Sequence, residues 1–340
     1  MVMIGTRVVC PLMLCAGLFA QEKPVAAIDD WSDLARRAAE FQRQAKFAEA
    51  ESLALKAVKE ADRFGTDSVK AAVCLYNLAS ISQDLGKYTE ARNYYQRSIA
   101  IYEKALGPED LSLAYPLNNL GALDLALGQY SESEKLRRRS LAIRVKNLGP
   151  DHPHVARVLQ NLAEIYRLEG RYPEAESLCL QALAIWEKNA ATGWPEMAQV
   201  RSTLALIRMD AGRYDDAEIE IRLALDILER TVGPDHPALV RPLNNLAAIE
   251  RHRGRLSEAE ATLKTARTIA ESRLGPSHPR TVEVLTEYVT LLKCEGRKAE
   301  AKSMERLVKA NQPAPAGEHL GQYTIDVAEL RASRDTTAGK

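Results

Sequence analysis

The sequence lacks an excess of charge of either sign. Its 46 lysine and arginine residues are matched by 46 aspartate and glutamate residues, so the formal net charge is zero at pH 7. Proteins that bind nucleic acids usually show a strong basic excess, and a basic membrane-binding patch needs a cluster of lysine and arginine. The charge balance therefore argues against both classes of ligand.

Signatures of catalysis and of metal binding are missing as well. The chain contains no GxSxG, HExxH, P-loop or GxGxxG motif. Two of its five cysteines lie in the first twenty residues, and the spacing of Cys74, Cys179 and Cys294 fits neither a disulfide framework nor a zinc site. We therefore predict a protein that is not an enzyme, with no catalytic residue, metal, cofactor or small-molecule substrate.

Long apolar runs are absent except at the start of the chain. There, Arg7 is followed by thirteen uncharged residues ending at Ala20, and then by the polar stretch QEKP. This layout is typical of a secretory signal peptide, and the run is short for a membrane span. We expect a leader over 1–20, a linker over 21–29 and export to the periplasm or the cell exterior. An uncleaved leader, which would anchor the chain to the membrane, is the alternative.

What the sequence has instead is a period of 42 residues. Several landmarks share it, and the clearest is a glycine series: Gly86, Gly128, Gly170, Gly212, Gly254 and Gly296. Tyrosine follows the first four of these glycines two residues later, and proline and the segments NNLG, QNLA and NNLA keep the same spacing. Self-similarity at one fixed period is the signature of a repeat architecture.

Each repeat is predicted to form two helices. The first runs from about His154 to Glu169 in the best-defined unit, and Gly170 ends it because glycine readily adopts the left-handed conformation at a helix C-terminus. Pro173 suits the first turn of the second helix. One such pair cannot bury its apolar face alone, so neighbouring pairs must stack.

The predicted fold is therefore all-α, an α-α superhelical solenoid of about seven helix-turn-helix hairpins. The hairpins are expected at about 30–64, 68–106, 112–148, 154–190, 196–232, 238–274 and 280–310. The tail at 311–340 shows no repeat and is expected to be flexible.

Three histidines recur within the repeat, in the segments GPDHP and GPSHP. His152, His236 and His278 occupy the same position in three units, which places them at least one repeat apart and too far from one another to bind one metal ion. We interpret this position as the turn between hairpins, where Asp151 or Asp235 is predicted to cap the following helix.

Some repeats depart from the pattern. Arg201 stands where two other units have Leu159 and Leu243. Pro116 and Pro242 lie inside predicted first helices, and we expect them to kink these helices or delay their start.

The pattern small–x–x–Tyr–x–x–x–Gly–x–Tyr–x–x–Ala resembles the tetratricopeptide repeat. The 42-residue form with LGPDHP, NNLA, GRY and EAE is similar to the subtype found in kinesin light chains, and the resemblance covers residues 30–310. It implies a scaffold for protein interactions. The chain lacks the long heptad run of kinesin light chains, which argues against a motor role.

A second, polar face of the first helices carries the candidate site. Asn77, Asn119, Asn161 and Asn245 are equivalent positions, and the resemblance implies that such asparagines bind the backbone of an extended peptide. The alternative is a merely solvated face. Arginines flank this series, so we predict that acidic residues of the peptide lie toward the C-terminal repeats. The predicted peptide-binding residues are Asn77, Asn118, Asn119, Asn161, Asn244, Asn245, Arg157, Arg167, Arg241 and Arg251.

Two functions remain open at this point. The first is a scaffold that binds an extended, acidic peptide segment of an unidentified protein partner in the concave groove. The alternative is an assembly scaffold of the cell envelope that packs against folded subunits. A third, weaker idea is that the tail segment at 323–333, which contains Asp326 and Glu329, occupies the groove itself.

Overall fold

A computed structural model of the chain describes residues 30–189 and 194–311. These residues form fourteen α-helices and three short 3₁₀-helices, and no strand occurs among them. The all-α prediction is confirmed. The predicted leader, the linker and all of the predicted tail except Asn311 lie outside the described residues.

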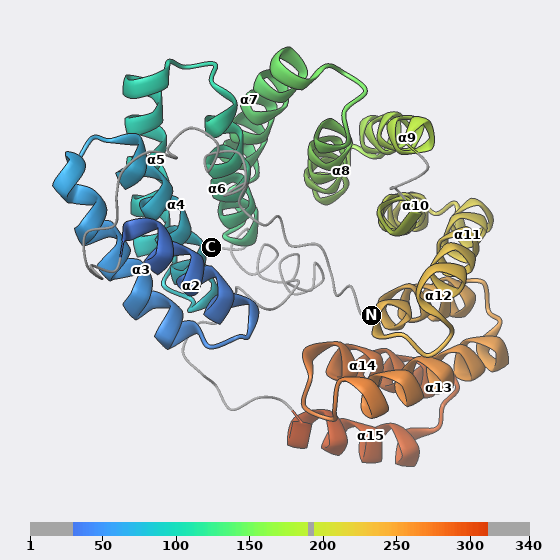
Figure 1. Ribbon diagram of the computed structural model, residues 1–340. Coiled ribbons are helices and arrows are strands. Elements are labelled where there is room, and N and C mark those ends of the chain that lie inside the picture. Colours follow the sequence, from blue (N-terminus) through green and yellow to red (C-terminus); the bar gives the residue numbers. More distant parts are fainter. Residues whose placement is uncertain (1–29, 190–193, 312–340) are drawn as a thin grey trace, which may run out of the picture. The chain divides into compact units, whose positions relative to one another are not determined.

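The helices pair in sequence order into seven hairpins, as predicted (Figure 1). The pairs are α2 (Trp31–Arg43) with α3 (Phe47–Ala61), α4 (Val69–Asp84) with α5 (Tyr88–Leu106), α6 (Ala114–Ala126) with α7 (Tyr130–Leu148), α8 (Pro153–Leu168) with α9 (Tyr172–Lys188), α10 (Trp194–Asp210) with α11 (Tyr214–Val232), α12 (Val240–His252) with α13 (Leu256–Arg273), and α14 (Pro279–Cys294) with α15 (Lys298–Asn311). Short 3₁₀-helices follow α3 (Asp62–Phe64) and precede α6 (Leu111–Leu113) and α12 (Pro237–Leu239).

The turn inside the last six hairpins depends on the recurring glycine. Gly170 has φ +77°, a left-handed conformation, and its N–H donates to the carbonyl of Arg167 at 3.0 Å. The N–H of Arg171 donates to the carbonyl of Tyr166 at 2.8 Å. These two bonds form a Schellman motif, which satisfies the last carbonyls of α8 and turns the chain toward α9.

The recurring histidine is the N-cap of the first helix. Nδ1 of His152 accepts the N–H of His154 at 3.1 Å, and Nδ1 of His236 accepts the N–H of Ala238 at the same distance. The prediction that Asp151 caps the helix is wrong, and the same holds for Asp235. Asp151 lies one residue too early to reach the free N–H groups, and its carboxylate instead pairs with Lys188 at 2.8 Å.

Both internal prolines delay the start of their helices, as predicted. Pro116 and Pro242 are the third residues of α6 and α12, and a 3₁₀-turn precedes each helix. When the repeats are aligned on their 42-residue period, α8 and α14 begin three residues earlier than α6 and α12, at Pro153 and Pro279. A proline in the first turn is tolerated because its missing N–H would have no partner within the helix.

The described helices divide into two compact units at Ala105 and Leu106. In the N-terminal unit, α2 to α5 enclose Leu34, Leu75 and Tyr95. In the C-terminal unit, small residues lie where helices cross: Ala163, Ala175 and Ala182 are 0% exposed. These small side chains allow α8 and α9 to approach closely.

Within the C-terminal unit the first helices of successive hairpins also contact one another, α8 with α10, α10 with α12, and α12 with α14. Figure 1 shows α6, α8, α10, α12 and α14 on the inner side of this unit, with their second helices on the outer side. We call the exposed side of these five first helices the inner face. Among the described residues, no helix combines the length and the apolar character that crossing a membrane requires.

A ladder of ion pairs joins the hairpins of the C-terminal unit. In the last four hairpins, the arginine that follows the hairpin glycine binds a glutamate on the preceding second helix. The pairs are Arg171 with Glu134, Arg213 with Glu176, Arg255 with Glu218, and Arg297 with Glu260. We call these pairs the junction ladder. They explain why arginine recurs beside the glycine.

Candidate functional site

The inner face contains five of the six predicted asparagines. Asn118, Asn119, Asn161, Asn244 and Asn245 are all half-exposed on α6, α8 and α12. The sixth, Asn77, belongs to the N-terminal unit. It is 7% exposed, and its Nδ2 has no acceptor among the described residues. We leave Asn77 out of the proposed site because its amide is closed to a ligand.

A network of side-chain amides links α6 to α8. Nδ2 of Asn161 donates to Oδ1 of Asn118 at 3.1 Å, and Nδ2 of Asn118 donates to Oδ1 of Asn119 at 3.3 Å. Each donating nitrogen carries a second hydrogen, which these bonds leave unused. The network therefore presents N–H donors while two of its carbonyl oxygens are already occupied.

The amide series changes character beyond α8. Thr203 takes the equivalent position on α10, where its hydroxyl accepts from Nε2 of Gln160 at 3.1 Å. On α12, Oδ1 of Asn244 is buried and has no donor among the described residues. The structure thus joins Asn118, Asn119 and Asn161, and leaves the α12 pair apart from them.

The predicted arginines are less available than the sequence analysis assumed. Arg167 is 5% exposed, and its guanidinium binds Asp210 at 2.5 Å and both oxygens of Glu164. Burial raises the pKa of the Glu164 carboxyl, but the charge and hydrogen bonds of Arg167 outweigh burial and lower that pKa. Arg167 is therefore a link between α8 and α10, and we leave it out of the proposed site too.

Two more predicted arginines have acidic neighbours. Arg251 binds Glu287 at 2.8 Å, which links α12 to α14, and Nη2 of Arg157 lies 4.0 Å from Glu196. Arg241 is exposed and forms no ion pair within the part of the chain that the structure describes. The predicted basic end is thus largely neutralised by acids on the next hairpin.

Sequence reasoning missed a buried arginine behind the amide network. Arg137, on α7, is 4% exposed and occupies the core position that Cys179 holds in α9 and Ile221 holds in α11. Its Nη1 donates to the backbone carbonyl of Asn161 at 2.6 Å, and its Nε finds no acceptor among the described residues. Burial lowers the pKa of Arg137 to about 10.

The chain makes room for this arginine at Gly121. A Cβ atom on Gly121 would lie 2.9 Å from Cγ of Arg137 and 3.3 Å from the carbonyl of Ser133. The same position is alanine in four other hairpins, at Ala79, Ala163, Ala205 and Ala247. Gly121 and Arg137 are each unlike the residues at the equivalent positions of the other repeats. These two exceptions occur in the same hairpin, and that coincidence is the sequence signal that predicts their contact.

A second buried arginine lies under the start of the same helices. Arg144 is 4% exposed, and its guanidinium lies 4.8 Å from the ring centroid of Tyr115. The Tyr115 ring in turn meets the His154 ring edge-on, with 6.3 Å between their centroids. Burial, and then the charge of Arg144, lower the pKa of His154 to about 4. His154 therefore stays neutral at physiological pH.

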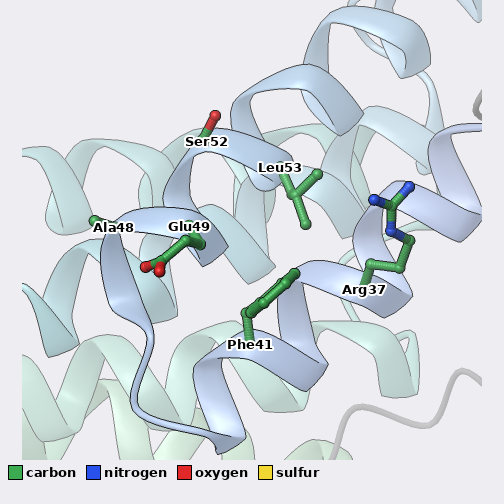
Figure 2. Close-up of a pocket in the computed structure, with 6 residues that line it drawn as sticks. All are labelled: Arg37, Phe41, Ala48, Glu49, Ser52 and Leu53. Atoms are coloured by element: carbon green, nitrogen blue, oxygen red, sulfur yellow. The ribbon is translucent and has the colours of Figure 1, made fainter.

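Other candidate sites carry less chemistry. No group of three or more histidine, cysteine, aspartate or glutamate side chains that could hold a metal ion occurs within 30–189 and 194–311. A pocket of about 430 Å³ lies between α2 and α3 in the N-terminal unit. Figure 2 shows Phe41 and Leu53 reaching toward one another in this pocket, with Arg37 beside them.

The position of Phe41 within its repeat explains this pocket. Its equivalent in α8, Tyr166, is covered by the preceding second helix and donates to Glu134 of α7 at 2.7 Å. Among the described residues no helix precedes α2. We interpret the pocket as the open end of the helical stack rather than as a ligand cleft.

Comparison with protein families and solved structures places the fold. The tetratricopeptide repeat family model matches residues 34–104, 71–143, 112–188, 196–272 and 239–308. A comparison with curated proteins found no match.

Three solved structures illustrate the likeness. The nearly identical TPR-like repeats described for a kinesin light chain of Podospora anserina are 27% identical, with a TM-score of 0.51, over 58% of this chain and 93% of that one. BtubC (BKLC) from P. vanneervenii is 22% identical, with a TM-score of 0.58, over 67% and 92%. A Rap protein complexed with Competence and Sporulation Factor is 17% identical, with a TM-score of 0.54, over 82% and 77%. The last two likenesses show the fold alone.

Proposed function

Because the chain belongs to the tetratricopeptide repeat family, whose solenoids are scaffolds for protein interactions, we propose that it binds an extended peptide segment of a partner protein along its inner face. The proposed ligand is a linear segment with acidic residues. No chemical step is part of this function. The proposal leaves the identity of the partner open.

The amide network of α6 and α8 is the observation that supports this function. A peptide in extended conformation presents backbone carbonyls and N–H groups that no secondary structure satisfies. Asn118 and Asn161 keep unused N–H donors, and both side chains are half-exposed on one face. Amides of this kind bind a backbone whatever its side chains are. Specificity must then come from neighbouring groups.

Charge supplies one such neighbouring group. Arg241 is exposed on the inner face, and Arg157 keeps partial exposure beside its 4.0 Å contact with Glu196. Guanidinium groups bind carboxylates through paired hydrogen bonds. These two arginines support the acidic character of the ligand, whereas Arg167 and Arg251 are engaged within the fold. The Rap protein that was solved as a complex shows that an array with this fold can hold a ligand.

A selection from a random-peptide display library on the full chain tests the proposal. It is run in parallel on the variant with Arg157→Glu and Arg241→Glu. We expect enrichment of a linear motif with acidic residues on the natural chain, and loss of that motif on the variant. A folded helical sample that enriches no peptide would contradict peptide binding. A motif that binds both proteins equally would contradict the acidic preference alone.

An assembly scaffold of the cell envelope is the second candidate. Large apolar side chains on the outer helices α9 and α11 favour it: Leu180, Ile219 and Leu223 are 48%, 57% and 41% exposed. A folded partner could cover them. This candidate predicts capture of intact proteins and no affinity for short peptides. It shares with the first candidate the proposal of export, which N-terminal sequencing of the mature protein tests by showing a start at Gln21.

A further inference from the structure

We infer that three histidine caps make the C-terminal unit sensitive to mild acid. His152, His236 and His278 hold the first turns of α8, of the 3₁₀-helix before α12, and of α14 in place only while their imidazole rings are neutral. As the pH falls from about 7 to about 5, these three turns loosen. This device belongs to the fold itself and does not depend on the proposed peptide-binding function.

The three histidines cap their helices through the same ring atom. In each case Nδ1 accepts the backbone N–H of the second residue after the histidine at 3.1 Å. The backbone of each histidine is extended, with φ between −79° and −72° and ψ of 138° or 139°. This geometry is that of an N-cap residue. All three residues are half-buried, so protons from the solvent can reach the rings.

The cap hydrogen bond requires a neutral ring. A neutral imidazole has one nitrogen that donates and one that accepts, so Nδ1 accepts an N–H only when the ring proton is on Nε2. A protonated ring carries hydrogen on both nitrogens and accepts nothing. It also places a positive charge at the N-terminus of a helix, where the helix dipole is already positive. Protonation therefore removes the cap and adds a repulsion.

A helix can be capped at this position without histidine. In hairpins α4–α5 and α6–α7 the equivalent residues are Ser68 and Asp110, whose side-chain oxygens accept backbone N–H groups at 3.2 Å and 2.8 Å. Serine and aspartate are among the residue types most favoured at N-caps. What histidine adds is a change of charge between about pH 5 and 8, a range in which neither of the other two ordinarily titrates. Capping alone therefore does not explain the histidines.

The surroundings of His152 favour its neutral form. Burial, and then the charge of Arg144 on α7, lower the pKa of His152. The His154 ring lies 5.1 Å from the His152 ring, measured between centroids. The carboxylate beside it in the turn, that of Asp151, is paired with Lys188 of α9 at 2.8 Å. Among the described residues, none of the three capping histidines forms an ion pair that would hold a proton on its ring.

The two later caps have similar surroundings. Burial, and then the charge of Arg280, lower the pKa of His278. Beside His236, the carboxylate of Asp235 faces Arg273 of α13 at 4.0 Å. Where the folded-state pKa lies below the unfolded value of about 6.5, the unfolded chain binds more protons. The stability that such a cap contributes is then present above that value and is lost as the pH falls through the folded-state pKa.

Loosening at these positions acts on the inner face. α8, α12 and α14 all contribute to that face, and local opening of a few residues costs less free energy than unfolding of the whole chain. A ligand held there should therefore be released in mild acid before the chain unfolds. This consequence rests on the proposed function, whereas the loosening itself is measured without a ligand. Failure of peptide binding and failure of the acid response are thus separate results.

Thermal unfolding of the full chain at pH 7 and pH 5, followed by circular dichroism, tests the acid response. The variant with His152→Asn, His236→Asn and His278→Asn keeps good N-caps that do not titrate. Between these pH values we expect the melting temperature of the natural chain to fall further than that of the variant, by about 2–4 °C for each histidine. The other histidines and the carboxylates are present in both proteins, so their effects cancel.

Asp110→Asn is the matched control, because it changes a cap at the same repeat position without removing a histidine. Its melting temperature should follow that of the natural chain over this pH range. Parallel curves for the natural chain and the histidine variant would overturn the inference, and so would an equal response of the Asp110→Asn and histidine variants.

Nuclear magnetic resonance of the natural chain gives a second test that does not depend on whether the variant folds. Nδ1 of the three caps should lack a proton at pH 7. The capped N–H groups of His154, Ala238 and Arg280 should lose protection against hydrogen exchange between pH 7 and pH 5, and the N–H of Ser112, capped by Asp110, should not. Rings that become protonated while the capped N–H groups keep their protection would overturn the inference, because the histidines would then act only by packing.

Discussion

The hairpins α6–α7 and α8–α9 share one backbone plan and have opposite interiors. In α8–α9, the positions where the helices meet are Ala163, Ala175, Cys179, Ala182 and Trp186, all buried. In α6–α7, the equivalent residues are Gly121, Ser133, Arg137, Ser140 and Arg144, and all four of the polar ones are also buried. The same hairpin shape therefore does not require an apolar interior.

In α6–α7, which we call the polar hairpin, the buried side chains donate their hydrogen bonds to backbone carbonyls. Ser133 donates to the carbonyl of Gly121 at 2.6 Å, Ser140 to that of Ala114 at 2.7 Å, and Arg137 to that of Asn161 at 2.6 Å. A helical carbonyl has a second lone pair that can accept such a bond. Hydroxyl groups can thus replace methyl groups at little cost. The arginine differs, because its hydrogen bonds do not neutralise its charge.

Transferring the arginine to the apolar hairpin should have the largest effect. Cys179→Arg would bury a guanidinium against Ala163, where no glycine makes room for it. We expect a loss of more than about 4 kcal/mol in the free energy of unfolding, the range seen for buried unpaired charges. Urea unfolding followed by circular dichroism measures it. Cys179→Met controls for volume and should cost about 1–3 kcal/mol. Equal losses for both variants would show that charge is not the cause.

Filling the glycine of the polar hairpin should have an intermediate effect. Gly121→Ala adds a Cβ atom 2.9 Å from Cγ of Arg137, and we expect it to cost about 1–2 kcal/mol despite the better helix propensity of alanine. In an Arg137→Ala background, which lacks the clashing Cγ atom, the same change should instead stabilise by up to about 1 kcal/mol. The four proteins form a double-mutant cycle. Additive effects would contradict the steric link between the two positions.

Acid should act on the junction ladder rather than on the polar hairpin, because arginine stays charged. The hydrogen bond from Arg297, with those from Lys264 and Tyr288, lowers the pKa of Glu260 to about 2. Since the folded-state pKa is the lower one, this contribution to stability is present above the unfolded-state value of about 4.3 and is lost as the pH falls toward 2.

Glu260→Gln should therefore cost about 1 kcal/mol at pH 7, the upper range for partly exposed pairs. The difference from the natural chain should shrink as the pH falls toward 2. Denaturant titrations at pH 7, 4 and 3 check this. A constant difference across these pH values would mean that the ionised carboxylate is not what stabilises the junction.

The sequence predicts the helical hairpins more accurately than it predicts the contacts of the side chains at the candidate site. Gly170 and Pro153 act on the few residues around them, so their effects can be predicted from local chemistry. The repeat pattern locates the histidine turn but does not show which side chain caps the helix: the cap is His152, and the predicted Asp151 is one residue away from it. Arg167 was predicted to face the ligand, and its partner Asp210 lies 43 residues later on the next hairpin.

The sequence by itself determined that this chain is a repeat of helical hairpins, because a glycine, a proline and an apolar face recur every 42 residues and each acts locally. Tertiary structure decided which inner-face groups remain for a ligand. That outcome depends on how successive hairpins stack, since stacking brings Asp210 to Arg167 and Glu287 to Arg251 but no carboxylate into an ion pair with Arg137 among the described residues. Side chains one repeat apart come into contact only when successive hairpins stack. The local sequence of one hairpin does not determine how it packs against the next.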